Sequence, residues 1–286
     1  MIARSVPALC LVFLLALAPR VAFAEPDFRF EGAFAQGGLV MGKAPPGATL
    51  HLDGKAVRLS REGDFVIGFG RDAALKARLA YRLPDGAEGA LALAIAPREF
   101  PVERVNDLPQ GLVTPPPADL KRIQEESAAL ARAREADSAG SFFKSGVAWP
   151  VLGRVSGVFG SLRILNDEPR SPHAGTDIAA PKGTPVAAAM DGTVADVYPD
   201  LFFTGKTVLL DHGHGLFTVY AHLDRIDVTA GRRVRKGDPI GALGASGRAT
   251  APHLHWGMSW LGVPLDPELA AGPMPRPEAA VSGAAE

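Results

Sequence analysis

The chain has 286 residues, which suffices for about two domains that each bury a core of their own. Its formal net charge of −1 provides no basic excess to neutralise phosphates, so we expect no nucleic acid partner. Its 32 glycines and 25 prolines, with only 7% aromatic residues, favour a loop-rich β protein over a long helical one.

The first 24 residues have the pattern of an export signal. Arg4 gives a positive start, residues 6–19 are apolar, and Ala22-Phe23-Ala24 places small residues where a signal peptidase cuts. We predict a signal peptide over 1–24 and an exported mature chain, periplasmic or extracellular, with no membrane span. The alternative is a retained anchor, but Arg20 interrupts the apolar stretch before the roughly 20 residues that a span needs.

Cys10, the only cysteine, lies inside that signal. The mature protein would therefore have no disulfide, no thiolate nucleophile and no cysteine ligand for a metal. Any metal would have to be held by nitrogen and oxygen atoms.

Residues 25–114 have the short strands and tight turns of a small β-sandwich. Asp53-Gly54 is a strong signal for a two-residue hairpin turn. The sole histidine of this region, His51, lies in mid-strand and is predicted to be a surface residue, so we expect no catalytic group here. The predicted strands cover 49–52, 55–59, 65–69, 79–83 and 91–95.

Residues 115–140 form the predicted linker. Pro115-Pro116-Pro117 ends the strand pattern, and a helix is predicted over 118–136. One face of this helix holds only Leu120, Ile123 and Leu130 as apolar residues, which favours a docking or spacer helix over a coiled coil.

The strand pattern returns over 141–271, with more glycine, and predicts a second β domain. Its clearest strands cover 194–198, 207–211 and 216–220. The proline- and alanine-rich end, 272–286, is predicted to be a disordered tail.

Six of the seven histidines fall between His173 and His255. Pro172 and Gly175 argue against a helix around His173 and Asp177, so we expect a turn that enters a strand and aims both side chains at one point. Such a pair can supply an imidazole nitrogen and a carboxylate oxygen to a metal. Taken alone, it is better explained as a hydrogen-bonded pair that stabilises a loop.

His253 and His255 flank Leu254, and in a strand the two imidazoles would share one face. Two imidazoles packed in a core would bury polar nitrogens that need partners, so a shared site explains them better. His222 is expected at the end of a strand and alone would be a satisfied core histidine. His212 and His214 lie in a glycine turn beside Asp211 and are interpreted as structural, or as supporting the site from behind.

Two histidines, one carboxylate and an open position form the ligand set of a catalytic zinc. The same set serves non-haem iron oxygenases, so the ligands alone leave both metals open. A zinc hydrolase also needs a proton acceptor and a donor to the oxyanion. His222 and His253 supply these two roles, which favours hydrolysis.

These motifs resemble, in content and order, the lysostaphin-type (LytM-domain) peptidoglycan metalloendopeptidases. The resemblance covers about 151–267, and its motifs are His173-Ala174-Gly175-Thr176-Asp177, Tyr220-Ala221-His222-Leu223 and His253-Leu254-His255. It implies a mainly antiparallel β domain with the site in a groove, and cleavage of stem or cross-bridge peptides of peptidoglycan.

The resemblance also implies the roles of the site residues. Zinc (Zn2+) would be held by His173, Asp177 and His255, with His222 and His253 as the catalytic histidines. Phe202 and Phe203 are candidates for the wall of the groove, although either could instead pack in the core.

Two alternatives remain open. Family members that lack ligands or catalytic histidines are non-catalytic regulators that bind the cell wall or activate an amidase, whereas all five positions are filled here. The segment Met190-Asp191-Gly192-Thr193-Val194 resembles the sandwich of biotin or lipoyl carrier domains, but Asp191 stands where the biotin motif has its lysine. A regulatory protein partner is not identified by the sequence.

Overall fold

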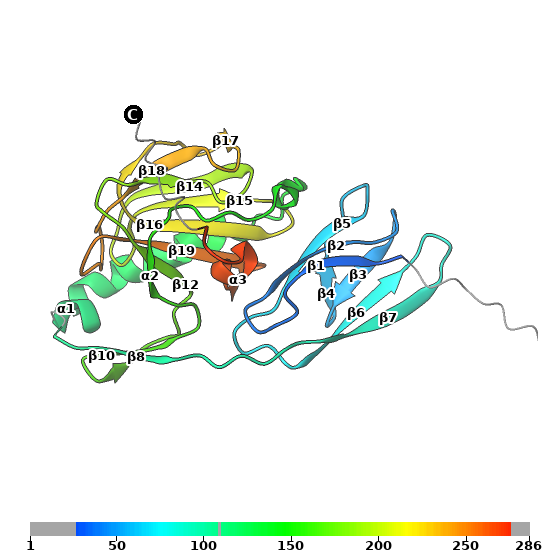
Figure 1. Ribbon diagram of the computed structural model, residues 1–286, viewed down its shortest axis with the longest axis horizontal. Coiled ribbons are helices and arrows are strands. Elements are labelled where there is room, and N and C mark those ends of the chain that lie inside the picture. The colour runs from blue at the N-terminus through cyan, green and yellow to red at the C-terminus, as the bar shows by residue number, and fades with distance from the viewer. Residues whose placement is uncertain (1–26, 108–109, 276–286) are drawn as a thin grey trace, which may run out of the picture.

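The structure is a computed structural model that describes residues 27–107 and 110–275. The predicted signal peptide, residues 1–24, lies outside this part of the chain. Strands dominate the described residues and form four sheets, which confirms the predicted mainly β fold. Figure 1 shows two lobes, with the blue and cyan strands in one and the green to orange strands in the other.

The N-terminal lobe contains two antiparallel sheets that enclose a common core, as expected of a small β-sandwich. Asp53 and Gly54 have φ angles of 48° and 82°, which a two-residue hairpin turn requires, and His51 is exposed as predicted. One sheet contains β1 (Arg29–Gly32), β2 (Leu39–Lys43) and β5 (Asp64–Gly68); the other contains β3 (Thr49–Leu52), β4 (Lys55–Val57), β6 (Lys76–Arg82) and β7 (Glu88–Ala94).

The C-terminal lobe is built on one large sheet in which every paired neighbour is antiparallel, in the order β17-β14-β15-β16-β19-β12-β9. Its inner face covers a core that includes Ile178, Tyr220 and Leu254. The strands are β9 (Arg154–Gly157), β12 (Gly175–Ala179), β13 (Pro185–Ala187), β14 (Gly192–Leu201), β15 (Gly205–Asp211), β16 (Leu216–Ile226), β17 (Arg233–Val234), β18 (Pro239–Leu243), β19 (His253–Trp260) and β20 (Val263–Leu265).

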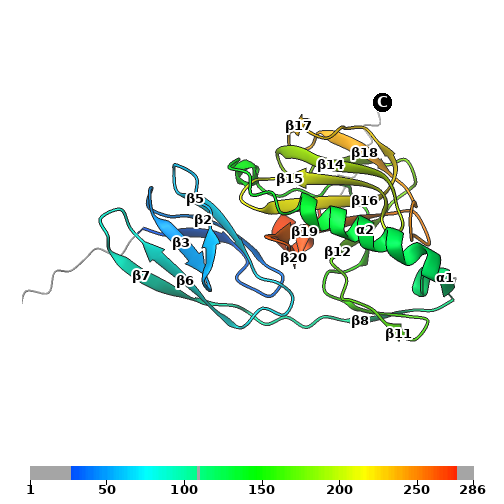
Figure 2. The same ribbon diagram turned by 180° about the vertical axis from the view of Figure 1, so that it is seen from behind.

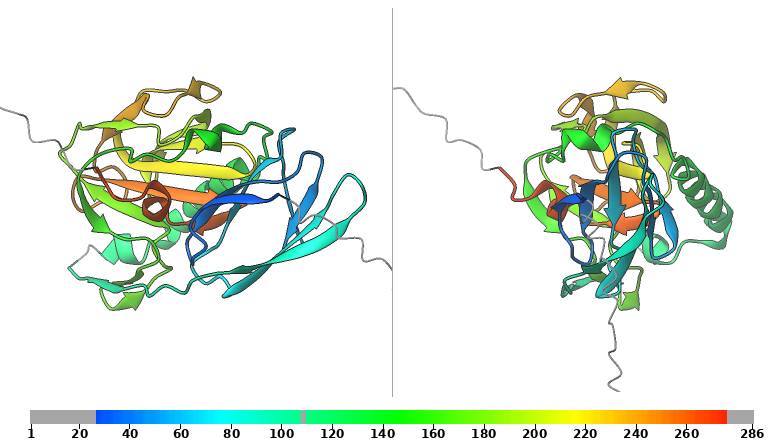
Figure 3. Two further views of the ribbon diagram at one scale, coloured as in Figure 1. Left: turned by 45° about the vertical axis from the view of Figure 1, so that its right-hand side comes forward. Right: turned by 90° about the vertical axis from the view of Figure 1, so that its right-hand side faces the viewer.

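The two lobes share a hydrophobic core. Trp260 and Leu265, from β19 and β20, belong to the same buried cluster as Phe65 of β5. Figure 3 shows the blue N-terminal strands against the orange C-terminal ones. Arg98, after β7, donates to the buried carboxylate of Asp266 at 2.8 Å, and that carboxylate also caps α3 (Pro267–Ala271). The N-terminal lobe is therefore fixed against the strand that carries His253 and His255.

An extended segment leaves β7 and runs along the C-terminal lobe (Figure 1). Within it, β8 (Val102–Val105) pairs in parallel with β10 (Leu162–Leu165), and β11 (Glu168–Pro169) completes this small sheet. Strand β8 lies inside the region predicted as the N-terminal domain, 25–114, and yet its partner belongs to the region predicted as the peptidase domain. Strand pairing thus continues across the predicted boundary.

Three helical segments follow: the short α1 (Gln110–Val113), the 17-residue α2 (Pro117–Ala133) and the 3-10 helix η1 (Phe142–Ser145). Figure 2 shows α2 lying across the outer face of the large sheet, as the docking interpretation expects. Its contacts with the end of β14 and with the turn that follows are polar. Arg122 donates to the carbonyl and carboxylate of Asp200 at 2.8 and 3.0 Å, and Glu126 accepts from the Phe202 amide at 2.7 Å.

The end of the described chain is held against the C-terminal lobe. The Gly272 carbonyl accepts a hydrogen bond from the Trp149 indole at 2.9 Å, and the Met274 sulfur accepts one from the Gly153 amide at 3.5 Å. These first residues of the predicted disordered tail, 272–286, therefore have fixed partners, and residues 276–286 lie outside the described part. Across 27–107 and 110–275, no helix is long and apolar enough to cross a membrane.

The contact between Glu126 and Phe202 predicts local protection of the turn that follows β14. We expect Glu126→Ala to speed hydrogen exchange at the Phe202 amide by about tenfold or more, because a hydrogen bond to a charged acceptor is lost. The matched control is Glu125→Ala, whose exposed side chain pairs with Lys121 at 3.8 Å and with no other charged group among the described residues. Exchange measured by mass spectrometry over 200–204 checks this, and equal rates in both variants would contradict it.

Candidate metal centre

Strand pairing brings the central residues of the candidate site together. Strands β12 and β19 are antiparallel neighbours, and their register places Asp177 directly opposite His255. His173 lies in the irregular segment just before β12, where a turn was predicted from Pro172 and Gly175. On β19, Leu254 is buried in the core while His253 and His255 face the other side of the sheet, as the strand period predicts.

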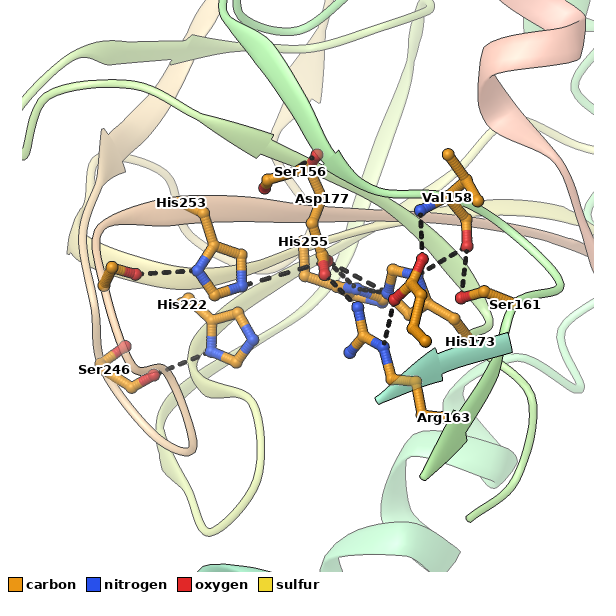
Figure 4. A network of polar contacts seen from close by, with 12 residues as sticks. Ser156, Val158, Ser161, Arg163, His173, Asp177, His222, Ser246, His253 and His255 are labelled. Atoms are coloured by element: carbon orange, nitrogen blue, oxygen red, sulfur yellow. Dashed lines mark hydrogen bonds and ion pairs between the residues drawn. The ribbon is translucent and has the colours of Figure 1, made fainter. Parts of the chain in front are cut away.

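Three side chains meet at one point (Figure 4). The Nε2 atom of His173 lies 3.0 Å from Nδ1 of His255 and 3.1 Å from Oδ1 of Asp177. The His255 Nδ1 lies 2.9 Å from the same carboxylate oxygen. Burial alone would raise the pKa of Asp177, but the hydrogen bonds and charges of His173 and His255 outweigh burial, so this pKa is held well below its ordinary value. The carboxylate is therefore ionised at neutral pH.

This arrangement fits a metal ion with nitrogen and oxygen ligands. Bonds of about 2.0–2.1 Å around a tetrahedral zinc separate two ligand atoms by about 3.3 Å, close to the three separations above. The Nδ1 of His173 donates to the Val158 carbonyl at 3.1 Å, which leaves its Nε2 lone pair directed at the other two ligand atoms. His173, Asp177 and His255 could thus hold one ion together.

Two further imidazoles lie beside these three residues. The ring centres of His222 and His253 are 4.6 Å apart, and the ring centres of His222 and His255 are 6.2 Å apart. In each ring Nδ1 donates to a backbone carbonyl, of Ser246 or Ala251, at 2.8 Å, so that Nε2 is the remaining polar atom. Figure 4 shows both rings close to the three residues that could hold a metal.

The sequence predicted His222 at the end of a strand. In the structure it lies inside β16. Its φ angle is 61°, unusual for a residue other than glycine, and the register of β16 against β18 shifts just after it. The backbone amide of His222 donates to the Thr204 carbonyl at 2.8 Å. Burial, followed by the charges of His255 and His253, lowers its pKa to about 3, so the ring is neutral at pH 7.

Arg163 of β10 is a site residue that the sequence did not reveal. Its guanidinium contacts the second carboxylate oxygen of Asp177 and lies 3.5 Å from the Glu103 carboxylate of β8. At Gly157 an added Cβ would lie 2.6 Å from that Asp177 oxygen and 2.7 Å from Arg163, so only glycine leaves room for the contact. The parallel pairing of β8 with β10 creates this arrangement, and it has no local signal.

The five predicted site residues all line one groove, which has a volume of about 530 Å3. They are His173, Asp177, His222, His253 and His255. Its lining also includes Phe203, whereas Phe202 is not among the lining residues, so one of the two predicted aromatics faces the groove. Glu103 brings a side chain from the predicted N-terminal domain into the same groove. Sequence reasoning expected no group from that region at the site.

The other predicted histidines are structural. His212 is fully buried; its Nδ1 donates to the Asp191 carbonyl at 2.6 Å, and its Nε2 accepts from the Thr218 hydroxyl at 2.6 Å. His214 is buried against the ring of Phe143, 5.0 Å away. Asp211 accepts from the Gly213 amide at 2.8 Å rather than from a site histidine.

The sequence profile of peptidase family M23 matches residues 171–267. Among curated proteins, the chain is similar to the cell division protein DipM of Caulobacter vibrioides, with 34% identity over 163 residues that cover 55% of this chain and 25% of DipM. It is also similar to the peptidoglycan DD-endopeptidase ShyA of Vibrio cholerae, with 39% identity over 124 residues that cover 42% of this chain and 28% of ShyA. The chain thus spans about a quarter of the length of these curated relatives.

A solved structure extends the likeness beyond the matched domain. A crystal structure described as a peptidase M23 of Pseudomonas aeruginosa has 30% sequence identity and a TM-score of 0.64 to this chain. The match covers 83% of this chain and 94% of that one, so it includes most of both lobes.

The buried ring of His212 should make the free energy of unfolding depend on pH. Burial lowers its pKa from 6.5 to about 4 in the folded chain. The unfolded chain therefore takes up a proton near pH 6.5 and the folded chain only near pH 4, so this contribution is complete above pH 6.5 and is lost as the pH falls to 4. We expect a loss of at most about 3 kcal/mol in the free energy of unfolding.

Chemical unfolding at pH 7.0, 5.5 and 4.5 measures this loss. His212→Gln removes the titrating ring and leaves the other histidines in place, so its unfolding free energy should fall less over the same range. A loss of equal size in both proteins would contradict the assignment to His212.

Proposed function

The chain belongs to peptidase family M23, and we propose that it is an exported zinc metalloendopeptidase that hydrolyses peptide bonds in the stem peptides or cross-links of peptidoglycan. The observation that carries the proposal is the convergence of two histidines and a carboxylate, with two more imidazoles beside them, in one groove. The similarity to ShyA, named as a peptidoglycan DD-endopeptidase, supports the substrate.

In this proposal His173, Asp177 and His255 hold the zinc ion. What zinc supplies when bound is Lewis acidity toward the scissile carbonyl and the attacking water. The backbone carbonyl of Val158 keeps His173 in the tautomer that has a lone pair on Nε2. Arg163 occupies the second oxygen of Asp177 and so fixes the carboxylate in place.

His222 and His253 take the two remaining catalytic roles. One takes up the proton of the attacking water, and the other stabilises the negative charge that develops on the carbonyl oxygen. Their hydrogen bonds to the carbonyls of Ser246 and Ala251 orient both rings before substrate arrives, which reduces the reorganisation needed in the transition state.

We further propose that this chemistry takes place outside the cytoplasm, because peptidoglycan lies there and residues 1–24 have the pattern of an export signal. Residues 141–271 would be the peptidase unit. The N-terminal domain, 25–114, and the linker, 115–140, would position its groove, since Glu103 and Glu126 contact residues around the site.

The second candidate is a non-catalytic regulator that binds the cell wall or activates an amidase. The name of DipM as a cell division protein favours it, since division proteins need not be hydrolases. By contrast, the presence of all three metal-ligand candidates and both catalytic histidines favours an active enzyme. Digestion of peptidoglycan separates the two.

Purified peptidoglycan incubated with the zinc-loaded chain tests the reaction class. We expect new amino and carboxyl ends within the peptides, detected by mass analysis of the fragments. A chelator should abolish the cleavage, and added zinc should restore it. Intact peptides with released sugars would contradict a peptidase, and stimulation of an amidase without cleavage would favour the regulator.

Three variants separate holding the metal from using it. His255→Ala removes one of three ligands, so zinc content and activity should fall together. His253→Ala and His222→Ala keep the three ligands, so zinc should remain near one per chain while turnover drops about 10²–10³-fold. Metal analysis beside an activity assay on the folded variants checks this. Loss of zinc from His253→Ala, with zinc retained by His255→Ala, would reverse the two roles.

A further inference from the structure

Positive charge surrounds the candidate metal centre. Among the described residues that line the groove, four are arginines, and only Glu103 and Asp177 carry carboxylates. The four arginines are Arg154, Arg163, Arg170 and Arg248. A groove with a cationic excess concentrates anions beside the reacting atoms.

Three of these arginines are neighbours: the Arg170 amide donates to the Arg163 carbonyl at 2.9 Å, and the charges of both act on Arg248. Arg163 lies on β10, Arg170 follows β11, and Arg248 lies in the loop between β18 and β19; all three line the groove. Burial lowers the pKa of Arg248, and the charges of Arg163 and Arg170 lower it further. The Arg248 guanidinium stays protonated, because the ordinary pKa of arginine is so high.

The carboxylates nearby are already engaged. Arg163 contacts Asp177 and lies 3.5 Å from Glu103, while Arg170 contacts Glu168. A divalent ion held by His173, Asp177 and His255 would add two positive charges next to this cluster. The loaded groove is therefore more cationic than the protein residues alone suggest, and a substrate anion would be strongly attracted.

Arg248 is held in a fixed orientation. Its guanidinium lies over the ring of Phe203, 4.4 Å from the ring centre, and its backbone amide donates to the Phe203 carbonyl at 2.8 Å. Stacking of this kind fixes the plane of the guanidinium. A planar, oriented guanidinium suits the two oxygens of a carboxylate better than it suits a neutral amide.

We propose that Arg170 and Arg248, with Arg163 beside them, bind a free carboxylate of the substrate peptide next to the scissile bond. The chemical class of substrate is then an acidic peptide, such as a stem peptide with free carboxylates, rather than a neutral bridge made of glycine. This inference rests on the proposed function and adds the determinant of specificity to it.

Two matched peptides test the inference. They share one sequence and one scissile bond, and differ only in whether the carboxylate next to that bond is free or amidated. With the zinc-loaded full chain, we expect kcat/KM to be about tenfold to a hundredfold higher for the free carboxylate, as for a charge-assisted hydrogen bond. Arg170→Gln and Arg248→Gln should lower this ratio toward one, mainly by slowing the free-carboxylate peptide.

Arg154→Gln is the matched control. It removes the same charge from the same groove, at an exposed residue that is not one of the three neighbouring arginines. The ratio between the peptides should stay close to that of the unaltered chain. A control that loses the preference as fully as Arg248→Gln would show a general field instead of a binding site, and would overturn the proposal.

Binding provides a readout that does not require turnover. An uncleavable analogue of each peptide, with the scissile amide reduced, is titrated calorimetrically against the chain and the three variants. We expect the free carboxylate to bind more tightly, and Arg170→Gln and Arg248→Gln to remove the difference. Circular dichroism and zinc content identify any variant that has failed to fold. If Arg248→Gln fails, Arg248→Lys replaces it, because lysine keeps the positive charge and lacks only the planar pair of N–H donors.

The outcomes separate the two proposals. Cleavage of both peptides at equal rates by the unaltered chain would overturn the carboxylate site and leave the peptidase function standing. No cleavage of either peptide, with preferential binding of the free-carboxylate analogue, would support the site and count against the function.

Discussion

The antiparallel pairing of β12 with β19 is the constraint on which the site depends. Its register sets Asp177 opposite His255, and the strand period places His253 on the same face two residues earlier. A slip of one residue would turn both imidazoles into the core and Leu254 out of it. Burial of Leu254 and Ile178, both fully enclosed, therefore fixes the positions of the residues that could hold a metal.

Surrounding elements hold this centre from several sides, and some lie far away in the sequence. Strand β8 supplies Glu103 to Arg163, which in turn contacts Asp177. Helix α2 holds the turn after β14, whose Thr204 carbonyl accepts the amide of His222. The shared core of the two lobes keeps these contacts in register. The parts outside the matched domain thus bear on the geometry of the groove.

Sequence reasoning succeeded where the signal is local. The hairpin at Asp53-Gly54 follows from the φ angles that only such residues adopt easily, and the common face of His253 and His255 follows from the strand period. It failed where the cause is long-range. Parallel pairing of β8 with β10 produces no recognisable pattern in the sequence of either strand, so neither Arg163 nor Glu103 could be predicted as a site residue. His222 was predicted at a strand end, whereas it lies in mid-strand just before a register shift.

Anomalous X-ray diffraction at the zinc edge, on crystals of the full chain grown with zinc, tests the central claim most directly. A single strong peak is expected within about 2.0–2.2 Å of a nitrogen of His173, a nitrogen of His255 and a carboxylate oxygen of Asp177. A peak at other residues, or none at these three with zinc in excess, would contradict the assignment of the metal centre.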